Sequence, residues 1–260
     1  VNAPAGIFLG EGEEDFYVFK GIPYAQPPVG DLRWKAPKNL FATNEVIDAT
    51  KFKSECIQPG REGLIPNRNV SVGSEDCLYL NIYIPKNQTD FNKNQFPVMF
   101  WIHGGSNIWG SGDFYDFSKL ATTQQVIVIT INYRLGLFGW FSSKHLRNTA
   151  SGLDKSSNFG QLDLIKGLEW VQQNISAFGG DKNNITIFGE SAGGHNVLTL
   201  LASPLSDGLF HKAISQSGYV SSYTQKFAEE ESELSSKSIF EEDIKFLPND
   251  DEVASYLRSL

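Results

Sequence analysis

Three apolar runs, each followed by a polar or glycine-rich turn, constrain the fold of this chain more than any other feature. They cover residues 96–102, 126–131 and 184–188. Runs that are apolar on both faces of an extended segment are typical of strands buried in a parallel sheet. A helical pattern over 160–177 precedes the third run, and residues 192–202 have the composition of a helix. Strands that alternate with helices of this length predict an α/β fold with parallel pairing and right-handed crossovers.

The rest of the chain adds edge elements to this sheet. A fourth short strand is expected over 212–217, and residues 16–20 and 78–84 predict antiparallel strands at the N-terminal edge of a largely parallel central sheet. Residues 228–251 are acidic and helix-compatible, which is typical of a solvated helical face. A chain of 260 residues with 40% hydrophobic content can bury one large core, so we expect a single domain.

Charge and hydropathy disfavour two classes of partner. The formal net charge of −8 argues against nucleic acid, whose backbone requires clustered Lys and Arg. No stretch approaches the roughly 18 apolar residues of a membrane-spanning helix, so we expect no such segment. Val1 does not open a basic and then apolar leader, so we expect any signal peptide to have been removed already.

The two cysteines leave their redox state open. Cys56 and Cys77 flank a segment rich in Gly, Pro and Asn that would close readily as a loop. Their spacing alone is as compatible with two free thiols as with a disulfide.

Four Asn-x-Ser/Thr sequons would suit a secreted glycoprotein, although a chain this rich in Asn, Ser and Thr acquires such sequons by chance. Asn69 and Asn87 lie in loop-like sequence and are the better glycosylation candidates. Asn174 ends an expected helix and Asn184 precedes an expected buried strand, where a bulky glycan is unfavourable.

The pentapeptide Gly189-Glu190-Ser191-Ala192-Gly193 lies between the third apolar run and the helix that follows it. A bare Gly-x-Ser-x-Gly pattern is usually a structural loop, but between a strand and a helix it forms a nucleophile elbow. The small flanking residues permit a sharp turn, and the N-terminal amides of the helix favour developing negative charge. This context predicts Ser191 as a catalytic nucleophile.

A second turn, His103-Gly104-Gly105-Ser106, follows the first apolar run. A serine nucleophile needs a base, and its tetrahedral intermediate needs hydrogen-bond donors for the oxyanion. Glycines after a strand let backbone N–H groups approach a reacting carbonyl without obstruction by side chains. A Gly-Gly turn alone is usually structural, but together with the elbow it predicts an oxyanion hole made by the amides of Gly105, Ser106 and Ala192.

Eight segments of the chain resemble the type-B carboxylesterase/cholinesterase family. They are 19–33 (FKGIPYAQPPVGDLR), 74–83 (SEDCLYLNIY), 101–105 (WIHGG), 132–136 (NYRLG), 158–163 (NFGQLD), 178–181 (FGGD), 188–193 (FGESAG) and 208–218 (GLFHKAISQSG). The resemblance implies an α/β-hydrolase fold, with residues 1–260 as the N-terminal part of one carboxylesterase domain. It also implies hydrolysis of small carboxylic esters through an acyl-serine, without a cofactor or metal, in an extracellular or lumenal setting.

The resemblance also assigns supporting residues. Cys56 and Cys77 fall where the family closes an N-terminal disulfide loop. Glu190 is similar to a family residue that shapes the hydrogen bonding of the site. Two pairs match structural ion pairs of the family and are expected to belong to the scaffold, namely Arg33 with Glu75 and Arg134 with Asp163.

The histidine and carboxylate of the expected triad are missing from these residues, because the family places both far beyond the serine. His103 belongs to the oxyanion turn, and His211 matches a structural family position. His145 precedes the serine in an expected loop. His195 lies on the serine's own helix, where we expect its side chain to project away from the hydroxyl or into packing. We therefore expect either the first half of a longer enzyme or a truncated product that is inactive alone.

Three smaller departures from the family pattern concern the site. Ser106 stands where the family most often has a third glycine, so a positive φ there would be strained. The Gly194-His195 pair brings a polar side chain to the sequence after the elbow. Tyr256 stands where many relatives have a cysteine, so we expect no second disulfide there.

The substrate class can be narrowed in one direction. Choline-ester hydrolases of this family hold the quaternary ammonium on a tryptophan of the disulfide loop, but residues 57–76 contain no Trp, Tyr or Phe. This favours a general carboxylesterase. Trp109, Phe114 and Tyr115 line either an acyl or entrance pocket or the core. The alternatives are a noncatalytic adhesion or structural protein and a serine peptidase or lipase on a similar fold.

Overall fold

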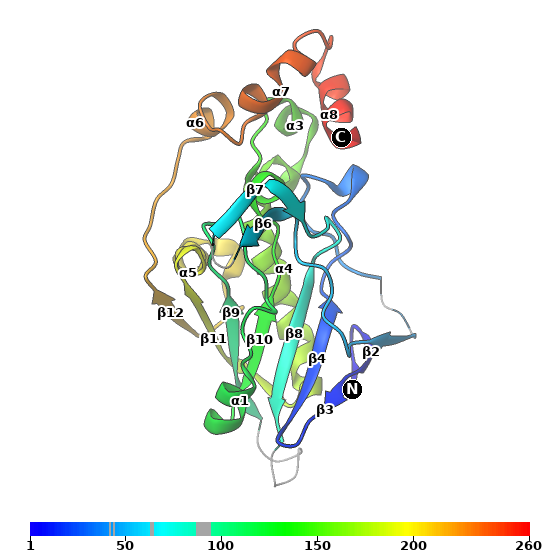
Figure 1. The fold of residues 1–260 in the computed structure, drawn as a ribbon, viewed down its shortest axis with the longest axis vertical. Coiled ribbons are helices and arrows are strands. Elements are labelled where there is room, and N and C mark those ends of the chain that lie inside the picture. The colour runs from blue at the N-terminus through cyan, green and yellow to red at the C-terminus, as the bar shows by residue number, and fades with distance from the viewer. Residues whose placement is uncertain (42, 44, 63–64, 87–94) are drawn as a thin grey trace.

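The computed structural model describes the chain except residues 42, 44, 63–64 and 87–94, so the glycosylation candidate Asn87 lies outside the described residues. A seven-stranded sheet forms the centre of the molecule (Figure 1). In spatial order its strands are β12 (Lys212–Gln216), β11 (Gly180–Glu190), β9 (Phe96–Ile102), β10 (Ile127–Ile131), β8 (Tyr79–Pro85), β4 (Phe16–Pro23) and β3 (Glu11–Gly12). The first four are parallel, whereas β8, β4 and β3 pair antiparallel. This confirms the predicted α/β fold with antiparallel N-terminal strands. The sheet is mixed rather than largely parallel, because three of its pairings are parallel and three are antiparallel.

Two smaller sheets lie in the N-terminal part of the chain. One joins β1 (Asn2–Ala3), β2 (Gly6–Leu9) and β5 (Val46–Asp48), and the other is the hairpin of β6 (Gln58–Glu62) and β7 (Ile65–Val72).

The sequon residues Asn69 and Asn174 differ in exposure to solvent. Asn69 is exposed but lies in strand β7, so the loop expected around it is wrong. Asn174 is buried, where its side chain accepts a hydrogen bond from the backbone N–H of Ala5 and donates one to the carbonyl of Trp170, both at 2.8 Å. A glycan would displace these bonds, so the unfavourable reading of Asn174 is supported.

The helices alternate with the parallel strands and continue beyond them. The α-helices are α1 (Ser118–Gln124), α2 (Gly136–Trp140), α3 (Lys144–Thr149), α4 (Phe159–Asn174), α5 (Ala192–Ala202), α6 (Gln225–Glu230), α7 (Ser236–Ile244) and α8 (Asp250–Ser259). Short 3-10 helices are η1 (Gly30–Leu32), η2 (Gly152–Lys155), η3 (Ile175–Phe178) and η4 (Pro204–Ser206). Among the described residues, none of these helices has the length and apolar character needed to cross a bilayer.

Alternate residues of the central strands pack into two separate clusters. On β9, Phe100 and Ile102 belong to the main core together with residues of α4 and α5, whereas Trp101 packs in a second cluster with Ala121 of α1. Successive side chains of a strand point to opposite faces, so both faces of β9 are buried. This burial explains why the parallel strands are continuous apolar runs.

The acidic C-terminal region forms three helices that gather near α3 (Figure 1). The side-chain oxygens of Thr224, Ser235 and Asn249 cap the N-termini of α6, α7 and α8. Within 228–251, Ile244 of α7 is buried in the main core, so this stretch is more than a solvated face, and α8 buries Val253 and Leu257 directly after it.

His145 lies in helix α3, which packs against α8, so the loop expected at His145 is wrong. The His145 ring Nδ1 lies 2.6 Å from the Asp250 carboxylate of α8, and the Ser143 hydroxyl caps the N-terminus of α3. A six-residue helix of this kind depends on its cap and its tertiary contacts, which a local pattern does not reveal.

Candidate active site

Ser191 occupies a sharp turn between β11 and α5. Its backbone has φ 55° and ψ −121°, a conformation rarely adopted by residues other than glycine. Its N–H donates to the carbonyl of Gln216 at 2.9 Å, and its carbonyl accepts from the N–H of His195 at 2.9 Å. The structure therefore holds Ser191 between the end of one strand, the end of its neighbour and the first turn of a helix.

The glycines that flank Ser191 are required by close approach of the backbone. A Cβ placed on Gly193 would lie 2.1 Å from the carbonyl oxygen of Ile102, at the end of β9. A Cβ on Gly189 would lie 2.6 Å from the carbonyl oxygen of Gly193. Both contacts are far inside van der Waals distance, so the elbow can seat against β9 only with glycine at these positions.

The structure brings the predicted oxyanion turn directly against the elbow. A Cβ on Gly104 would lie 3.2 Å from the Cβ of Ser191 and 2.7 Å from the carbonyl oxygen of Glu190. The Glu190 side chain is exposed, and its Oε2 would lie 3.2 Å from the same Cβ. Two turns that are far apart in the sequence thus meet at the carboxyl ends of β9 and β11, where ligands bind in open α/β sheets.

The predicted oxyanion donors are next in sequence to Gly104 and Ser191, the residues at which the two turns meet, and Ser106 among them has a strained backbone. Gly105 has φ 94° and Ser106 has φ 57°, so the positive φ considered for Ser106 is present. Ala192 is the first residue of α5, where the helix presents partial positive charge. Gly105 and Ser106 directly follow Gly104, which contacts Ser191, and Ala192 directly follows Ser191, while the role of the three amides in catalysis stays a prediction.

Each histidine has a partner away from the Ser191 hydroxyl. His103 is buried, stacks on Tyr133 with ring centroids 4.4 Å apart, and places Nδ1 2.9 Å from the carbonyl of Gly104. His211 Nδ1 accepts from the N–H of Ile185 at 3.2 Å. His195 Nδ1 contacts the carbonyl of Tyr219, in agreement with the expectation that it projects away from the hydroxyl.

Sequence reasoning missed a buried polar network beneath the oxyanion turn. The Tyr133 hydroxyl donates to the carbonyl of His103 at 2.6 Å, and Asn196 Nδ2 donates to Asn107 Oδ1 at 2.9 Å. Burial raises the pKa of the Tyr133 hydroxyl well above its usual range, so this group stays protonated and donates. No local motif marks Asn107 or Asn196, because their contact depends on the fold.

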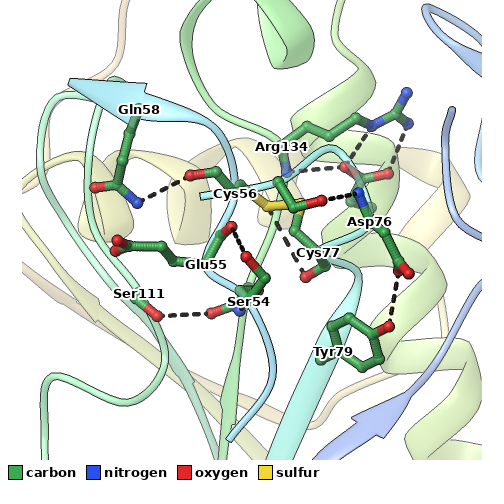
Figure 2. The surroundings of a disulfide bond; sticks show 12 residues. Ser54, Glu55, Cys56, Gln58, Asp76, Cys77, Tyr79, Ser111 and Arg134 are labelled. Carbon is green, nitrogen blue, oxygen red and sulfur yellow. Dashed lines mark hydrogen bonds and ion pairs between the residues drawn. A yellow bond between two sulfur atoms is a disulfide. The ribbon is translucent and has the colours of Figure 1, made fainter. Parts of the chain in front are cut away.

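The disulfide and both ion pairs implied by the family resemblance are present. Figure 2 shows the disulfide between Cys56 and Cys77, with Arg134 nearby. Cys56 and Cys77 are joined and buried. Two bidentate ion pairs accompany them, Arg33 with Glu75 at 2.7 and 2.5 Å and Arg134 with Asp163 at 2.8 and 2.7 Å. Asp163 is fully buried and also accepts from the backbone N–H of Arg134 at 3.0 Å, so this pair fixes the chain after β10.

The disulfide loop is tied to the segment after the oxyanion turn by Gln58, whose side chain is shown beside Cys56 in Figure 2. The Gln58 amide donates to the carbonyl of Gly110 at 2.9 Å and accepts from its N–H at 2.8 Å. This buried pair of hydrogen bonds was also missed from sequence.

The aromatic residues after the turn do not share one environment. Tyr115 is 42% exposed and packs edge-on against Trp101, with ring centroids 5.2 Å apart. Phe114 is also exposed, and the carbonyl of Trp109 lies 1.9 Å from a Cβ built on Gly105. Phe114 and Tyr115 are therefore not core residues, and their place in an acyl or entrance pocket stays a prediction. In the described part of the chain, no group of three or more His, Cys, Asp or Glu side chains could hold a metal ion.

Comparison with known proteins gives a consistent result. A sequence model described as the carboxylesterase family matches residues 1–259. The chain is 45% identical to the para-nitrobenzyl esterase of Bacillus subtilis (strain 168) over 88% of this chain and 45% of that protein. It is 44% identical to carboxylesterase 1E of Rattus norvegicus, over 77% of this chain and 36% of that protein.

Solved structures agree in fold. A thermophilic PNB esterase superposes on the whole chain with a TM-score of 0.83 and 39% sequence identity, over 51% of its own length. The chain thus spans about half, or less, of the length of the relatives it matches. From the family match over nearly every residue, and from the shared α/β-hydrolase fold, the chain belongs to the carboxylesterase family.

Proposed function

We propose that this chain supplies the nucleophile half of a serine carboxylic-ester hydrolase that acts through an acyl-serine at Ser191. The observation that carries the proposal is the contact between the oxyanion turn and the elbow. A Cβ built on Gly104 would lie only 3.2 Å from the Ser191 Cβ, so the contact requires glycine at 104. This places a strained serine beside backbone N–H groups at a helix N-terminus. Such donors stabilise the charge that develops on a carbonyl oxygen under attack.

In the proposed mechanism the Ser191 hydroxyl oxygen attacks the ester carbonyl carbon and gives its proton to a histidine. The amides of Gly105, Ser106 and Ala192 bind the resulting oxyanion. Collapse of the tetrahedral intermediate breaks the bond to the alkoxy oxygen, which leaves as the alcohol after taking the proton. Water then attacks the acyl-serine by the same route and releases the carboxylic acid. Glu190 is given a supporting role at the edge of the site.

We propose that the triad histidine and carboxylate come from the rest of the protein, beyond Leu260. Two observations support this part. The relatives are about twice as long as this chain or longer, and each of the four histidines here has a partner elsewhere. The 260-residue chain alone is accordingly expected to be inactive.

The proposed substrates are general carboxylic esters rather than choline esters. The disulfide loop offers no aromatic residue over 57–76 for a quaternary ammonium, and the relatives carry the names carboxylesterase and para-nitrobenzyl esterase. A disulfide forms most readily in an oxidising compartment, so we also propose a secreted or lumenal location, with Asn69 and Asn87 as glycan acceptors.

Hydrolysis of short-chain p-nitrophenyl esters by the whole protein tests the proposal. We expect measurable kcat in the wild type and a loss of at least about 10⁴-fold in Ser191→Ala, because the variant cannot form the acyl intermediate. Absence of hydrolysis in the folded whole protein would overturn the enzyme assignment and favour a noncatalytic binding role. Equal rates in wild type and Ser191→Ala would reject Ser191.

A further inference from the structure

We propose that Asn107 and Asn196 are positioning residues that fix the oxyanion turn relative to the nucleophile helix. The inference rests on the proposed function and assigns a role in it to a side-chain pair. Asn107 directly follows Ser106 in the turn, and Asn196 lies on α5, the helix that begins next to Ser191. Their hydrogen bond therefore joins the two halves of the site.

The contact is short and buried at the helix end. Asn196 Nδ2 donates to Asn107 Oδ1 at 2.9 Å, and Asn196 is only 2% exposed. The carbonyl of Asn196 accepts from Gln161 of α4 at 3.3 Å, so the α5 end of the bond is itself held by the core. Asn107 is half-buried, but loss of the bond would leave the buried Asn196 amide without this partner, which favours the observed arrangement.

The predicted oxyanion donors lie between two anchors. On one side, the buried Tyr133 hydroxyl donates to the carbonyl of His103 at 2.6 Å. On the other side, Asn107 accepts from Asn196 through its side chain and from the N–H of Gly136 through its carbonyl, the latter at 2.6 Å. The Tyr133 hydroxyl also lies 3.4 Å from Asn107 Oδ1, so the two anchors meet and residues 104–106 are held at both ends.

Asn107 also suits its backbone position. Its φ is 57°, in the left-handed region, which asparagine tolerates better than most residues. The turn is left-handed at both Ser106 and Asn107, and from this turn the Asn107 side chain reaches Asn196 of α5. The same residue thus provides the local conformation and the long-range bond.

This arrangement predicts an effect on the chemical step more than on substrate binding. Oxyanion donors act on charge that appears only in the transition state, and a misplacement of about 1 Å can cost on the order of 10²-fold in rate. Loss of the Asn107–Asn196 bond should therefore lower kcat and leave KM nearly unchanged. A purely structural role would instead lower the fraction of folded, active molecules.

The test uses Asn196→Ala, Asn107→Gly and the double variant of the whole protein. Glycine at 107 removes the side chain while keeping the left-handed conformation accessible. Rates are expressed per active site, titrated by the burst of p-nitrophenol, so unfolded molecules do not count. We expect each single variant to lose about 10- to 100-fold in kcat with KM within about twofold. The double variant should lose no more kcat than the single variant with the lower kcat, because both residues act through one bond.

Asn174→Ala is the matched control. Asn174 is likewise a buried amide with two hydrogen bonds, but it lies at the far end of α4. We expect it to lower the unfolding temperature and to leave kcat per site unchanged. Wild-type kcat per site in both single variants, or losses that multiply in the double variant, would overturn the inference. Failure of the proposed function would appear separately, as full activity in Ser191→Ala.

Discussion

Backbone strain gathers around Ser191. Of the six non-glycine residues with positive φ in the described chain, four lie in the turns at the carboxyl ends of the parallel strands, namely Ser106, Asn107, Ser191 and Ser217. Such conformations cost on the order of 1–3 kcal/mol each and persist only where the surroundings impose them. Their grouping in turns that meet agrees with a functional site, since a structural turn could use glycine instead.

Gly104, at which the oxyanion turn contacts the elbow, gives the sharpest prediction at the residue scale. In Gly104→Ala the new methyl would lie 2.7 Å from the carbonyl oxygen of Glu190 and 3.2 Å from the Ser191 Cβ. The oxyanion turn must then move away from the serine. We predict a loss of about 100-fold or more in the kcat of ester hydrolysis by the whole protein.

Gly12→Ala provides the control for Gly104→Ala. The nearest atoms to a Cβ on Gly12 are ring carbons of Tyr17 at 3.5 Å, an ordinary contact at the sheet edge. Its kcat should stay within about twofold of wild type. Wild-type kcat in Gly104→Ala would show that the two turns are not in contact during catalysis.

At the scale of elements, one carboxylate of α8, that of Asp250, bonds to two residues of α3. Hydrogen bonds from Asn148 and then from His145 hold the pKa of the Asp250 carboxyl below its usual value, aided by the nearby charge of Lys144. The folded state therefore binds the Asp250 proton less tightly than the unfolded chain does. The resulting stabilisation is present above about pH 4 and is lost as pH falls through the lowered folded-state pKa.

We predict that the backbone amides of α8 lose hydrogen-exchange protection as pH falls below about 4, after correction for intrinsic rates. The effect should be small, because the Asp250 side chain is 38% exposed and its pairing is screened by water. Asp250→Asn should remove most of this pH dependence. An unchanged pH dependence in that variant would assign it to other carboxylates.

The elements differ in how well the sequence predicts them. Strand β9 and helix α5 have the predicted bounds, because burial on both faces and a helix start after the elbow leave clear local patterns. Helix α3 and strand β7 were expected to be loops. Helix α3 has six residues and packs on α8, which is remote in sequence, and β7 depends on pairing with β6, so local composition carries little signal.

At the scale of the whole molecule, the predictable part of the site is the part encoded in contiguous residues. The elbow at Ser191 and the turn at Gly104 follow from short motifs, and the sheet order brings them together. The bond from Asn107 to Asn196 spans 89 positions and joins two residue types with no motif. Contacts of this kind depend on how the elements pack, which one sequence does not reveal.

The fold also explains why remote residues support the site. Arg134 and Asp163 fix the chain after β10, and Gln58 joins the disulfide loop to Gly110. Each contact connects the parallel strands to an N-terminal loop or a covering helix. The two turns are therefore held by the whole scaffold rather than by their own hydrogen bonds alone.

Reaction of the whole protein with a fluorophosphonate, followed by mass spectrometry of the modified peptide, tests most directly whether Ser191 is the nucleophile. We predict one phosphonyl adduct per protein, located on Ser191, with no adduct in Ser191→Ala and slower labelling in Gly104→Ala. An adduct on another serine of the whole protein, or equal labelling of Ser191→Ala, would contradict the assignment of Ser191.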